Sequence, residues 1–313
     1  MMMVLVMPLM TSCMKEIEFR GEETERKVVM NSMMKTGDDV VRVKMSYSKF
    51  FLTYGPVEYI NDAMVSLWRN GERCANGRYV GNGKYEFDET LNYGDSVYVE
   101  ALTQKGERVS ARTIMPDTVV VDDIQLNIDE NVDLYEEYQE YEFTLSFKLH
   151  DLVENSNYYQ IGLALYTEDS VTGALTYSRE LYFSCDDPML VENHVDLMGE
   201  GSDFRSLRFS DESIDGMDYL VKLSGSLFFS MNSYDTTGIT QMYLVVNTLS
   251  KDEYLYRKTY EQGSINEENP FVEPVMLYSN VKDGIGIFCG RTEQKYYLQR
   301  FKIVDGGYDF IKK

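Results

Sequence analysis

Histidine is scarce in this chain, which has only two, His150 and His194, among 313 residues. Neither is spaced from the other, or from a pair of cysteines, as the ligands of a zinc site are. With so little imidazole, a nucleophilic triad or a catalytic zinc site is hard to assemble. The sequence therefore predicts that the protein is not an enzyme and holds no metal or cofactor. We expect His150 to be a solvated side chain at the end of a strand.

Basic residues are outnumbered, with 30 lysines and arginines against 52 aspartates and glutamates and a formal charge of −22 at pH 7. A surface this acidic repels the phosphates of nucleic acids and the head groups of anionic lipids. Nucleic acid is therefore excluded as a partner. We interpret the acidic excess as solvation of the surface and not as a site for a cationic ligand.

Cysteine is also rare, and the four copies are Cys13, Cys74, Cys185 and Cys289. Their spacing supports neither a disulfide framework nor a zinc site. Once Cys13 is set aside, an odd number remains, so buried free thiols are predicted. A disulfide between Cys185 and Cys289 is the alternative.

The first twelve residues are uncharged and mostly apolar, but they are too few to span a bilayer. They end in Thr11-Ser12 directly before Cys13, as a bacterial lipoprotein signal does. We predict a signal peptide over residues 1–12, a lipid on Cys13 and a charged tether over residues 13–27; an export segment with an incidental cysteine is the alternative. A lipid would anchor the protein without a spanning helix. The basic residues that usually begin such a signal are missing, so the true start is expected upstream of Met1.

Tyrosine is abundant, with 25 copies against one tryptophan, and it suits strands that show one face to water. Short strand patterns separated by turn signals recur from residue 28 to residue 116. Examples are Val41–Tyr47, Met64–Trp68 before the Asn70-Gly71 turn, Lys84–Phe87 after Gly81-Asn82-Gly83, and Val97–Ala101 after Asn92–Asp95. This spacing predicts an immunoglobulin-like β domain over residues 28–116.

Pro116-Asp117 is the predicted domain boundary, because the proline ends a strand and an acidic stretch follows. The larger β-sandwich domain is predicted over residues 117–313. Tyr141–Leu149 alternates apolar and polar residues, and Tyr159–Leu165 is predicted to be its partner strand. Further strands are expected at Leu181–Phe183, Phe204–Phe209, Tyr219–Leu223, Met242–Val246 and Tyr296–Val304. The predicted fold class is all-β, with two antiparallel β-sandwich domains and one short helix.

That helix is predicted to start at Ser250, because Ser250-Lys-Asp-Glu253 has the spacing of a capping box. Pro270 and Pro274 then force an extended run, which continues to a turn at Asp283-Gly284 and a strand from Ile285. The order is strand, tight turn, strand. The glycines at 284, 286 and 290 lack the spacing of a dinucleotide loop, and no helix follows them, so a phosphate site is not expected.

These residues form the end of a longer pattern, Leu-Ser-x-x-x-Tyr-x-Tyr, then Asn-Pro-Phe-x-Glu-Pro, then Tyr-Ser-Asn-Val-x-x-Gly-x-Gly-Ile-Phe-x-Gly. The pattern, together with Cys13–Glu18 and Val28–Asn31, resembles an uncharacterised outer-membrane lipoprotein family of Bacteroidetes, domain-of-unknown-function family 4249. The residues that carry the resemblance are Pro270, Glu273, Pro274, Asn280, Gly284, Gly286 and Phe288. We expect this motif to be structural, so that Gly284→Val destabilises the fold through backbone strain.

The resemblance implies a two-domain, mostly β lipoprotein that is often encoded beside a TonB-dependent receptor. We therefore expect a lipid-anchored protein of the outer membrane, at the cell surface and not on the periplasmic side. Its expected role is a non-catalytic accessory or binding subunit of such a receptor in nutrient uptake. The alternative is a stand-alone surface protein that binds a solute or a glycan.

No residue can be assigned to a ligand from the sequence alone. Tyrosines at 158, 159, 254, 256 and 260 could be exposed and stack on sugar rings or form a protein interface, but core packing is expected to explain most of the tyrosines. The acidic residues from Asp129 to Glu140 partly match a calcium loop, but Leu134 stands where the loop needs glycine. A solvated acidic linker is the preferred interpretation there.

Overall fold

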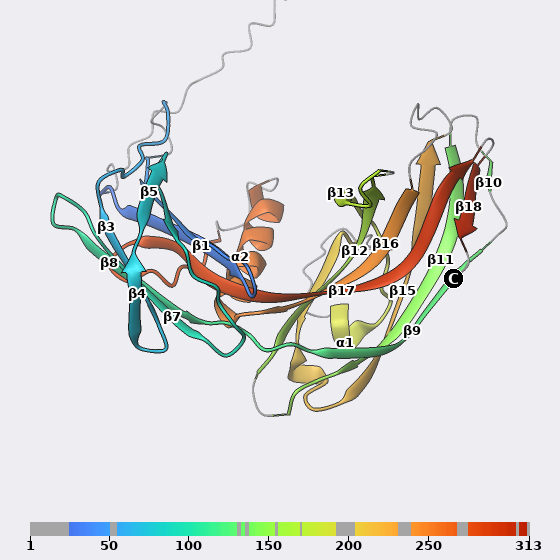
Figure 1. The fold of residues 1–313 in the computed structure, drawn as a ribbon. Coiled ribbons are helices and arrows are strands. Elements are labelled where there is room, and N and C mark those ends of the chain that lie inside the picture. Colours follow the sequence, from blue (N-terminus) through green and yellow to red (C-terminus); the bar gives the residue numbers. More distant parts are fainter. Residues whose placement is uncertain are drawn as a thin grey trace, which may run out of the picture.

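The computed structural model describes residues 25–50, 55–129, 133–134, 138–153, 156–169, 171–191, 204–230, 239–267, 275–304 and 307–311. It confirms the all-β class, with one ten-stranded sheet and two four-stranded sheets. Two lobes are visible, joined by a long strand that runs through both (Figure 1). Cys13, the predicted signal and most of the tether lie outside the described residues, as do Pro270, Glu273 and Pro274.

The N-terminal lobe is a sandwich of one end of the ten-stranded sheet and a separate four-stranded sheet. Its strands are β1 (Val28–Lys35), β2 (Val41–Tyr47), β3 (Met64–Arg69), β4 (Glu72–Asn76), β5 (Arg78–Gly81), β6 (Lys84–Phe87), β7 (Ser96–Leu102) and β8 (Arg108–Ile114). The turns predicted between them are confirmed, since Asn70, Gly71, Asn82 and Gly83 all have positive φ. Its core combines methionine, valine and alanine side chains with the buried rings of Tyr85, Phe87 and Phe288.

The C-terminal lobe packs the other end of the ten-stranded sheet against the β10-β11-β15 sheet, on which β9 also pairs. Its strands are β9 (Val120–Ile128), β10 (Asp133–Leu134), β11 (Tyr138–His150), β12 (Tyr158–Glu168), β13 (Leu175–Leu181), β14 (Ser206–Ser210), β15 (Asp218–Ser230), β16 (Ile239–Leu249), β17 (Ile285–Val304) and β18 (Gly307–Ile311). Its helices are α1 (Pro188–Val191), the 3-10 helix η1 (Asp211–Ser213) and α2 (Lys251–Glu267). No helix within the described ranges is long and apolar enough to cross a membrane.

β17 is a strand of 20 residues that the two lobes share. Its first part pairs in parallel with β1, from Val29↔Ile285 onward, and it pairs antiparallel with β16 along most of its length. Phe288 lies in the core of the N-terminal lobe and Phe301 in that of the C-terminal lobe. The first core therefore takes in residues far beyond Pro116, and the one parallel pair of strands in the described chain joins the first and last parts of the sequence.

The alternation predicted over Tyr141–Leu149 is confirmed in β11, where every second side chain is buried. The predicted partner strand is wrong, because β11 pairs with β9, β10 and β15, whereas β12 pairs with β13, β14 and β16 in the other sheet. Tyr159, Ile161 and Leu163 face the β11 side chains across the core. Alternation reports which face is buried but does not identify the neighbouring strand.

Helix α2 begins where predicted, and Ser250 Oγ accepts a hydrogen bond from the Glu253 amide at 3.3 Å. The reciprocal half of the capping box does not form, because the Ser250 amide donates to Gly290 O at 2.8 Å. The Glu253 carboxylate, which is fully buried, instead accepts from Arg257 at 2.8 Å and lies 3.6 Å from Arg291. The cap thus joins α2 to β17 by ionic contacts.

The stretch before β17 is not the predicted strand: residues 275–281 lie outside any sheet, and only Lys282 makes a bridge, to Ser110. The Asn280 side chain makes the hydrogen bonds that a neighbouring strand would make. It donates to Phe288 O at 2.8 Å and accepts from the Phe288 amide at 2.9 Å. The predicted turn is present, with φ of 57° at Asp283.

The glycines of this stretch are constrained in two ways. A Cβ on Gly284 would lie 2.7 Å from Val28 O, so crowding and not the predicted backbone strain would destabilise Gly284→Val. The strained backbone belongs to Gly286, with φ of +125°.

Candidate functional site

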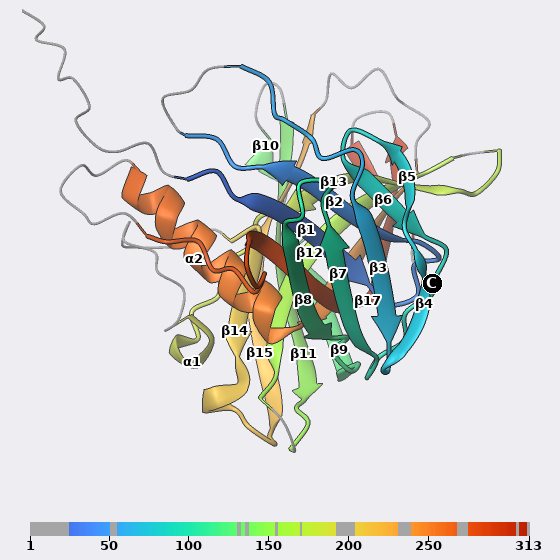
Figure 2. The ribbon, with the colours of Figure 1, turned by 90° about the vertical axis from the view of Figure 1, so that its left-hand side faces the viewer.

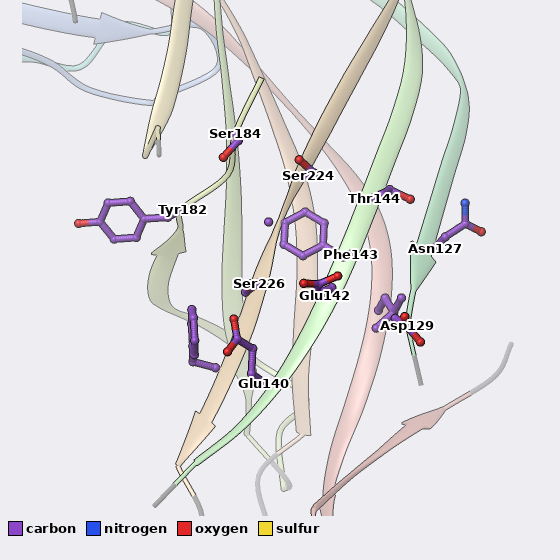
Figure 3. Close-up of a pocket in the computed structure, with 13 residues that line it drawn as sticks. Asn127, Asp129, Glu140, Glu142, Phe143, Thr144, Tyr182, Ser184, Ser224 and Ser226 are labelled. Carbon is purple, nitrogen blue, oxygen red and sulfur yellow. The ribbon is translucent and has the colours of Figure 1, made fainter. Parts of the chain in front are cut away.

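A pocket of about 690 Å³ lies on the outer face of the sheet formed by β9, β11 and β15 (Figure 3). We call it the polar trough. Its lining residues are Asn127, Ile128, Asp129, Glu140, Glu142, Phe143, Thr144, Tyr182, Ser184, Ser224, Gly225, Ser226 and Phe228. Most of them carry a hydroxyl, an amide or a carboxylate.

Strand register explains why these side chains meet. Asn127 pairs with Thr144, which pairs with Ser224, so three polar side chains form a row across β9, β11 and β15. Ser184 extends the row, because its amide donates to Ser224 O at 2.6 Å and its carbonyl accepts from the Ser224 amide at 3.0 Å. Positions on one face recur every second residue, so the neighbouring row brings Glu142 opposite Ser226.

The trough is acidic and partly aromatic. Three carboxylates line it, from Asp129, Glu140 and Glu142, and none of its described lining residues is a lysine or an arginine. Tyr182 is 47% exposed and Phe228 is 46% exposed, so two rings border the polar rows. Carboxylates and hydroxyls that accept and donate hydrogen bonds beside aromatic rings suit a neutral, hydroxyl-rich ligand.

A second depression of about 700 Å³ continues the trough and shares Asn127, Thr144, Ser184 and Ser224 with it. At its end lies Asp187, one of an adjacent aspartate pair. Its carboxylate accepts from the Tyr219 hydroxyl at 2.5 Å and from the Met189 amide at 3.0 Å. Burial and the bond to Asp187 raise the pKa of Tyr219 to about 12. Asp187 therefore holds α1 in place.

The polar trough was not predicted from the sequence. Its signal was the run Leu223-Ser-Gly-Ser-Leu227, in which small polar residues occupy the outward positions of a strand. Small side chains at outward positions leave room above a sheet, but only the pairing of β15 with β11 shows that Glu142 and Thr144 lie beside them.

A second exposed feature lies on the outer face of the ten-stranded sheet, which we call the tyrosine face. It consists of Tyr166, Tyr177, Tyr243 and Tyr297. Their rings meet edge to face, with centroids 5.8 Å apart for 177–166, 5.3 Å for 166–243 and 5.8 Å for 243–297. Such pairs hold the rings in fixed orientations.

Charged and amide side chains border the tyrosine face. Lys295 Nζ lies 4.6 Å from the centroid of the Tyr166 ring. Arg300 is paired with Glu168 at 2.7 Å, and Gln241 donates to the other oxygen of Glu168 at 2.7 Å. Lys295 also lies 3.6 Å from Glu293, so two cations face two carboxylates here, unlike in the chain as a whole, and this face does not repel an acidic partner.

The tyrosines that were considered for an exposed binding role mostly pack inside the protein or against one another. Tyr159 is fully buried and Tyr254 is 6% exposed, so core packing, and not an exposed role, is confirmed for both. Tyr158 stacks on Tyr254 with ring centroids 4.7 Å apart, which fixes α2 to the start of β12. Tyr256 and Tyr260 stack on each other at 6.4 Å, and Tyr260 alone of this set is 56% exposed.

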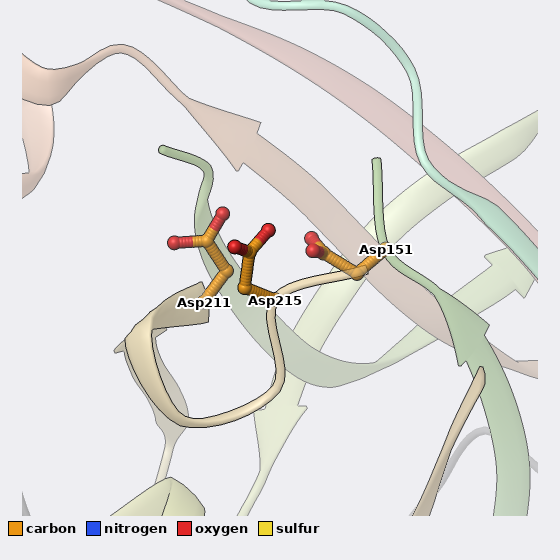
Figure 4. A group of neighbouring side chains, drawn as sticks. All are labelled: Asp151, Asp211 and Asp215. Carbon is orange, nitrogen blue, oxygen red and sulfur yellow. The ribbon is translucent and has the colours of Figure 1, made fainter. Parts of the chain in front are cut away.

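Three carboxylates gather at one end of the C-terminal lobe, from Asp151 after β11 and from Asp211 and Asp215 around η1 (Figure 4). Their oxygens lie within 4.8 Å of one another, and Asp151 and Asp211 are buried. Burial and the charge on Asp151 raise the pKa of Asp211. Donors to the two buried groups are Asn157 N, Tyr159 Oη and Gly216 N. These hydrogen bonds stabilise the two buried carboxylates, so no ligand is needed to explain the cluster.

His150 is not the solvated side chain that was predicted. Its Nδ1 lies 2.6 Å from Asp218 Oδ1 and its Nε2 lies 3.0 Å from Asp122 Oδ1. Hydrogen bonds to Asp122 and Asp218 raise the pKa of His150. The residue ties β11 to β9 and β15. His194 lies outside the described residues.

The described cysteines are free, as predicted, although Cys74 is only partly buried, and the alternative bridge between Cys185 and Cys289 is not formed. Both side chains are buried, and burial raises the pKa of each thiol. Of the partial calcium loop, Asp133 lies in β10 opposite Glu140, whereas Asn131 and Glu137 lie outside the described residues.

Several solved structures share low similarity with the chain. Salmonella alpha-2-macroglobulin has 11% identity and a TM-score of 0.25, with 90% of this chain and 15% of that chain covered. A putative membrane anchored protein from Corynebacterium diphtheriae has 12% identity and a TM-score of 0.21, with 71% and 54% covered. A DUF3823 family protein from Parabacteroides merdae has 10% identity and a TM-score of 0.15, with 72% and 92% covered. Scores this low support no argument about function.

No curated protein matches the chain. A family model does, described as a domain of unknown function, DUF4249, and the match runs over residues 14–296. Since that range covers most of the 313 residues, the protein belongs to the DUF4249 family.

Proposed function

We propose that the protein is a lipid-anchored, non-catalytic accessory subunit of a TonB-dependent receptor in the outer membrane of a Bacteroidetes species. Lipidation at Cys13 and the receptor partner are supported by the sequence resemblance. The observation that carries a binding role is the tyrosine face. Four tyrosine rings meet there on the outside of a sheet, where Tyr177 is 54% exposed and the other three are partly buried.

The tyrosine face suits a protein partner for a physical reason. Tyrosine buries a large area on binding and loses little conformational entropy, which is why it is enriched in interface hot spots. Here the edge-to-face contacts already fix the rings before a partner arrives. The Glu168–Arg300 pair and Lys295 at its border supply both charges for complementary contacts.

The proposal is tested by affinity purification of the tagged full-length protein from detergent-solubilised outer membranes of its host. We expect a TonB-dependent receptor to co-elute with the wild type. It should be lost with Cys13→Ala, which removes the anchor, and weakened with Tyr177→Ser. Tyr93→Ser is the matched control, because Tyr93 is 59% exposed in the N-terminal lobe. Elution of the wild-type protein alone would contradict the proposal.

A second function, a stand-alone glycan-binding protein, is favoured by the polar trough. Its hydroxyls and carboxylates beside Tyr182 and Phe228 match the groups that hold and stack sugar rings. We expect Glu142→Gln to abolish saccharide binding in a titration of the polysaccharides that the host uses, and Glu72→Gln, on exposed β4, to leave it unchanged. Recovery of the bound saccharide intact separates binding from hydrolysis by the trough carboxylates. If Glu142→Gln binds like the wild type, the trough is not the site.

A further inference from the structure

We propose that a cavity between the two lobes binds a small organic carboxylate with an apolar body. The cavity has a volume of about 750 Å³, within the range of small-molecule pockets. It is formed by the end of β8, the Pro116-Asp117 connection, the start of β12, the end of β16 and the first residues of α2. Pockets of this kind occur preferentially where two domains meet. The inference is independent of the receptor and of the trough.

The N-terminus of α2 provides the end of the cavity that attracts an anion. Figure 2 shows this end of the helix beside β8. Ser250 Oγ caps the amide of Glu253, and the amides of Lys251 and Asp252 have no acceptor in the part of the chain that the structure describes. Unpaired amides and the helix dipole of this 17-residue helix favour a negative charge.

Two basic residues line the same cavity, Lys251 from α2 and Arg112 from β8, whose guanidinium carbon lies 5.9 Å from the centroid of the Tyr98 ring. Neither forms an ion pair within the described ranges. The chain has many more acidic than basic residues, so acidic partners are not scarce. The acidic residues of the cavity, Asp117 and Asp252, accept hydrogen bonds from neutral donors, so the two basic residues are needed to offset them. Asp252 accepts from Thr113 Oγ1 at 3.1 Å and from the Tyr278 hydroxyl at 2.8 Å, and Asp117 accepts from the Thr118 amide at 2.7 Å.

A separate observation, a buried hydroxyl, also indicates a missing ligand. Thr248 lines the cavity and is 3% exposed, yet its Oγ1 has no hydrogen-bond partner among the described residues. A buried polar group without a partner costs about 1–3 kcal/mol. The oxygen itself is closed to water, so a carboxylate oxygen would accept its hydrogen bond once the side chain turns toward the cavity.

The opposite wall is apolar. Ile114 is 60% exposed and Leu152 is 37% exposed, and they reach the cavity from different lobes. Leu249 and Pro116 add buried or half-buried apolar surface between them. An apolar body would cover these side chains while its carboxylate meets the helix end. Two sources share this chemistry, a free fatty acid and the C-terminal residue of a peptide.

The test is calorimetric titration of the full-length chain carrying Cys13→Ala, which is handled without detergent. The probes are octanoate, 1-octanol and N-acetyl-leucyl-leucine. We expect a carboxylate probe to bind at least tenfold more tightly than 1-octanol. Binding by octanoate alone identifies a fatty acid as the source, and binding by the dipeptide alone identifies a peptide end.

Variants locate the site. Arg112→Gln combined with Lys251→Gln should weaken carboxylate binding at least tenfold, because both cations are removed from exposed positions. Thr248→Val should weaken it several-fold. Lys258→Gln, further along α2, is the control and should have no effect. Absence of heat with both carboxylates, equal affinity for 1-octanol, or no loss in the double variant would overturn the proposal. Equal melting temperatures establish that each variant is folded.

Discussion

The two lobes are both β-sandwiches, but their strands are paired in different ways. In the N-terminal lobe, four pairs join strands that are neighbours in sequence, β1–β2, β3–β4, β5–β6 and β7–β8, while β2–β6, β3–β7 and β1–β17 join strands further apart. In the C-terminal lobe, β11 pairs with β15 and β12 with β16, across long stretches of chain. Turn residues specify the first kind of pairing locally. The second kind depends on the burial of apolar side chains from distant parts of the chain. It can therefore form only when both distant strands are present.

The lobes also differ in how charge is buried. Under α2, the C-terminal lobe holds Glu253 against Arg257 and Arg291, and Arg208 against Glu261. Burial, and then the nearby Arg257, lower the pKa of Arg208 to about 10. The ion pairs of the N-terminal lobe, such as Arg42–Glu86, have at least one well-exposed partner. Helix α2 is thus attached by buried charge as well as by the stacking of Tyr254 on Tyr158.

The largest effect is expected from the strand that both lobes share. Phe288→Ala and Phe301→Ala should each lower the free energy of unfolding by about 3–5 kcal/mol, because both rings are fully buried. Trp68 is the only tryptophan and lies in the N-terminal lobe, so its fluorescence reports on that lobe. We expect Phe301→Ala to shift the Trp68 unfolding transition as much as the circular dichroism transition. An unmoved Trp68 transition would show that the lobes unfold independently.

The next largest loss of stability is expected from glycine substitutions, and one glycine is compared from each lobe. Gly286→Ala should lower the free energy of unfolding by about 3 kcal/mol, because its φ is +125° and a Cβ would collide with Met30 O. Gly225→Ala should cost less, about 2 kcal/mol, because its φ is ordinary, although a Cβ there would lie 2.8 Å from both the Phe143 ring and the backbone oxygen of Tyr182. Denaturant titration measures both. Equal losses would mean that crowding and not backbone conformation decides the cost.

Replacing a buried aspartate should have a smaller effect on the melting temperature. We expect the sign of this effect to be opposite in the two lobes. The raised pKa of Asp211 means that its ionised form destabilises the folded state, so stability rises as pH falls through the folded pKa. Asp211→Asn should therefore raise the melting temperature at pH 7, since its amide can donate to Asp151. Asp95→Asn should lower it, because both oxygens of Asp95 accept, from Asn70 at 2.7 Å and from Asn92 at 2.8 Å.

The smallest effect is a dependence on pH confined to the C-terminal lobe, since residues 28–116 contain no histidine. The pKa of His150 is raised by Asp122 and Asp218, so its stabilising contribution is complete below its ordinary value of 6.5. That contribution is lost as the pH rises through the folded pKa. We expect His150→Asn to flatten the melting temperature between pH 5.5 and 8.5. An unchanged slope would mean that the two carboxylates do not hold the imidazolium.

Much of the fold could be predicted where the signal is local. The Asn70-Gly71 turn, the alternation in β11 and the start of α2 at Ser250 each depend on residues close together in the chain. The candidate sites could not be predicted. The trough needs Asn127, Thr144 and Ser224 in one row, and that row exists only because distant strands adopt a particular register.

The sequence by itself determined the β class, the turns of the N-terminal lobe and family membership, because alternation, turn residues and motifs are properties of neighbouring residues. The tertiary structure decided that β17 runs through both lobes and pairs in parallel with β1. It also decided that Tyr159 and Tyr254 are buried, while other tyrosines form the exposed face. A strand pattern records which side chains avoid water, and the choice of neighbour follows from how the whole chain buries them together.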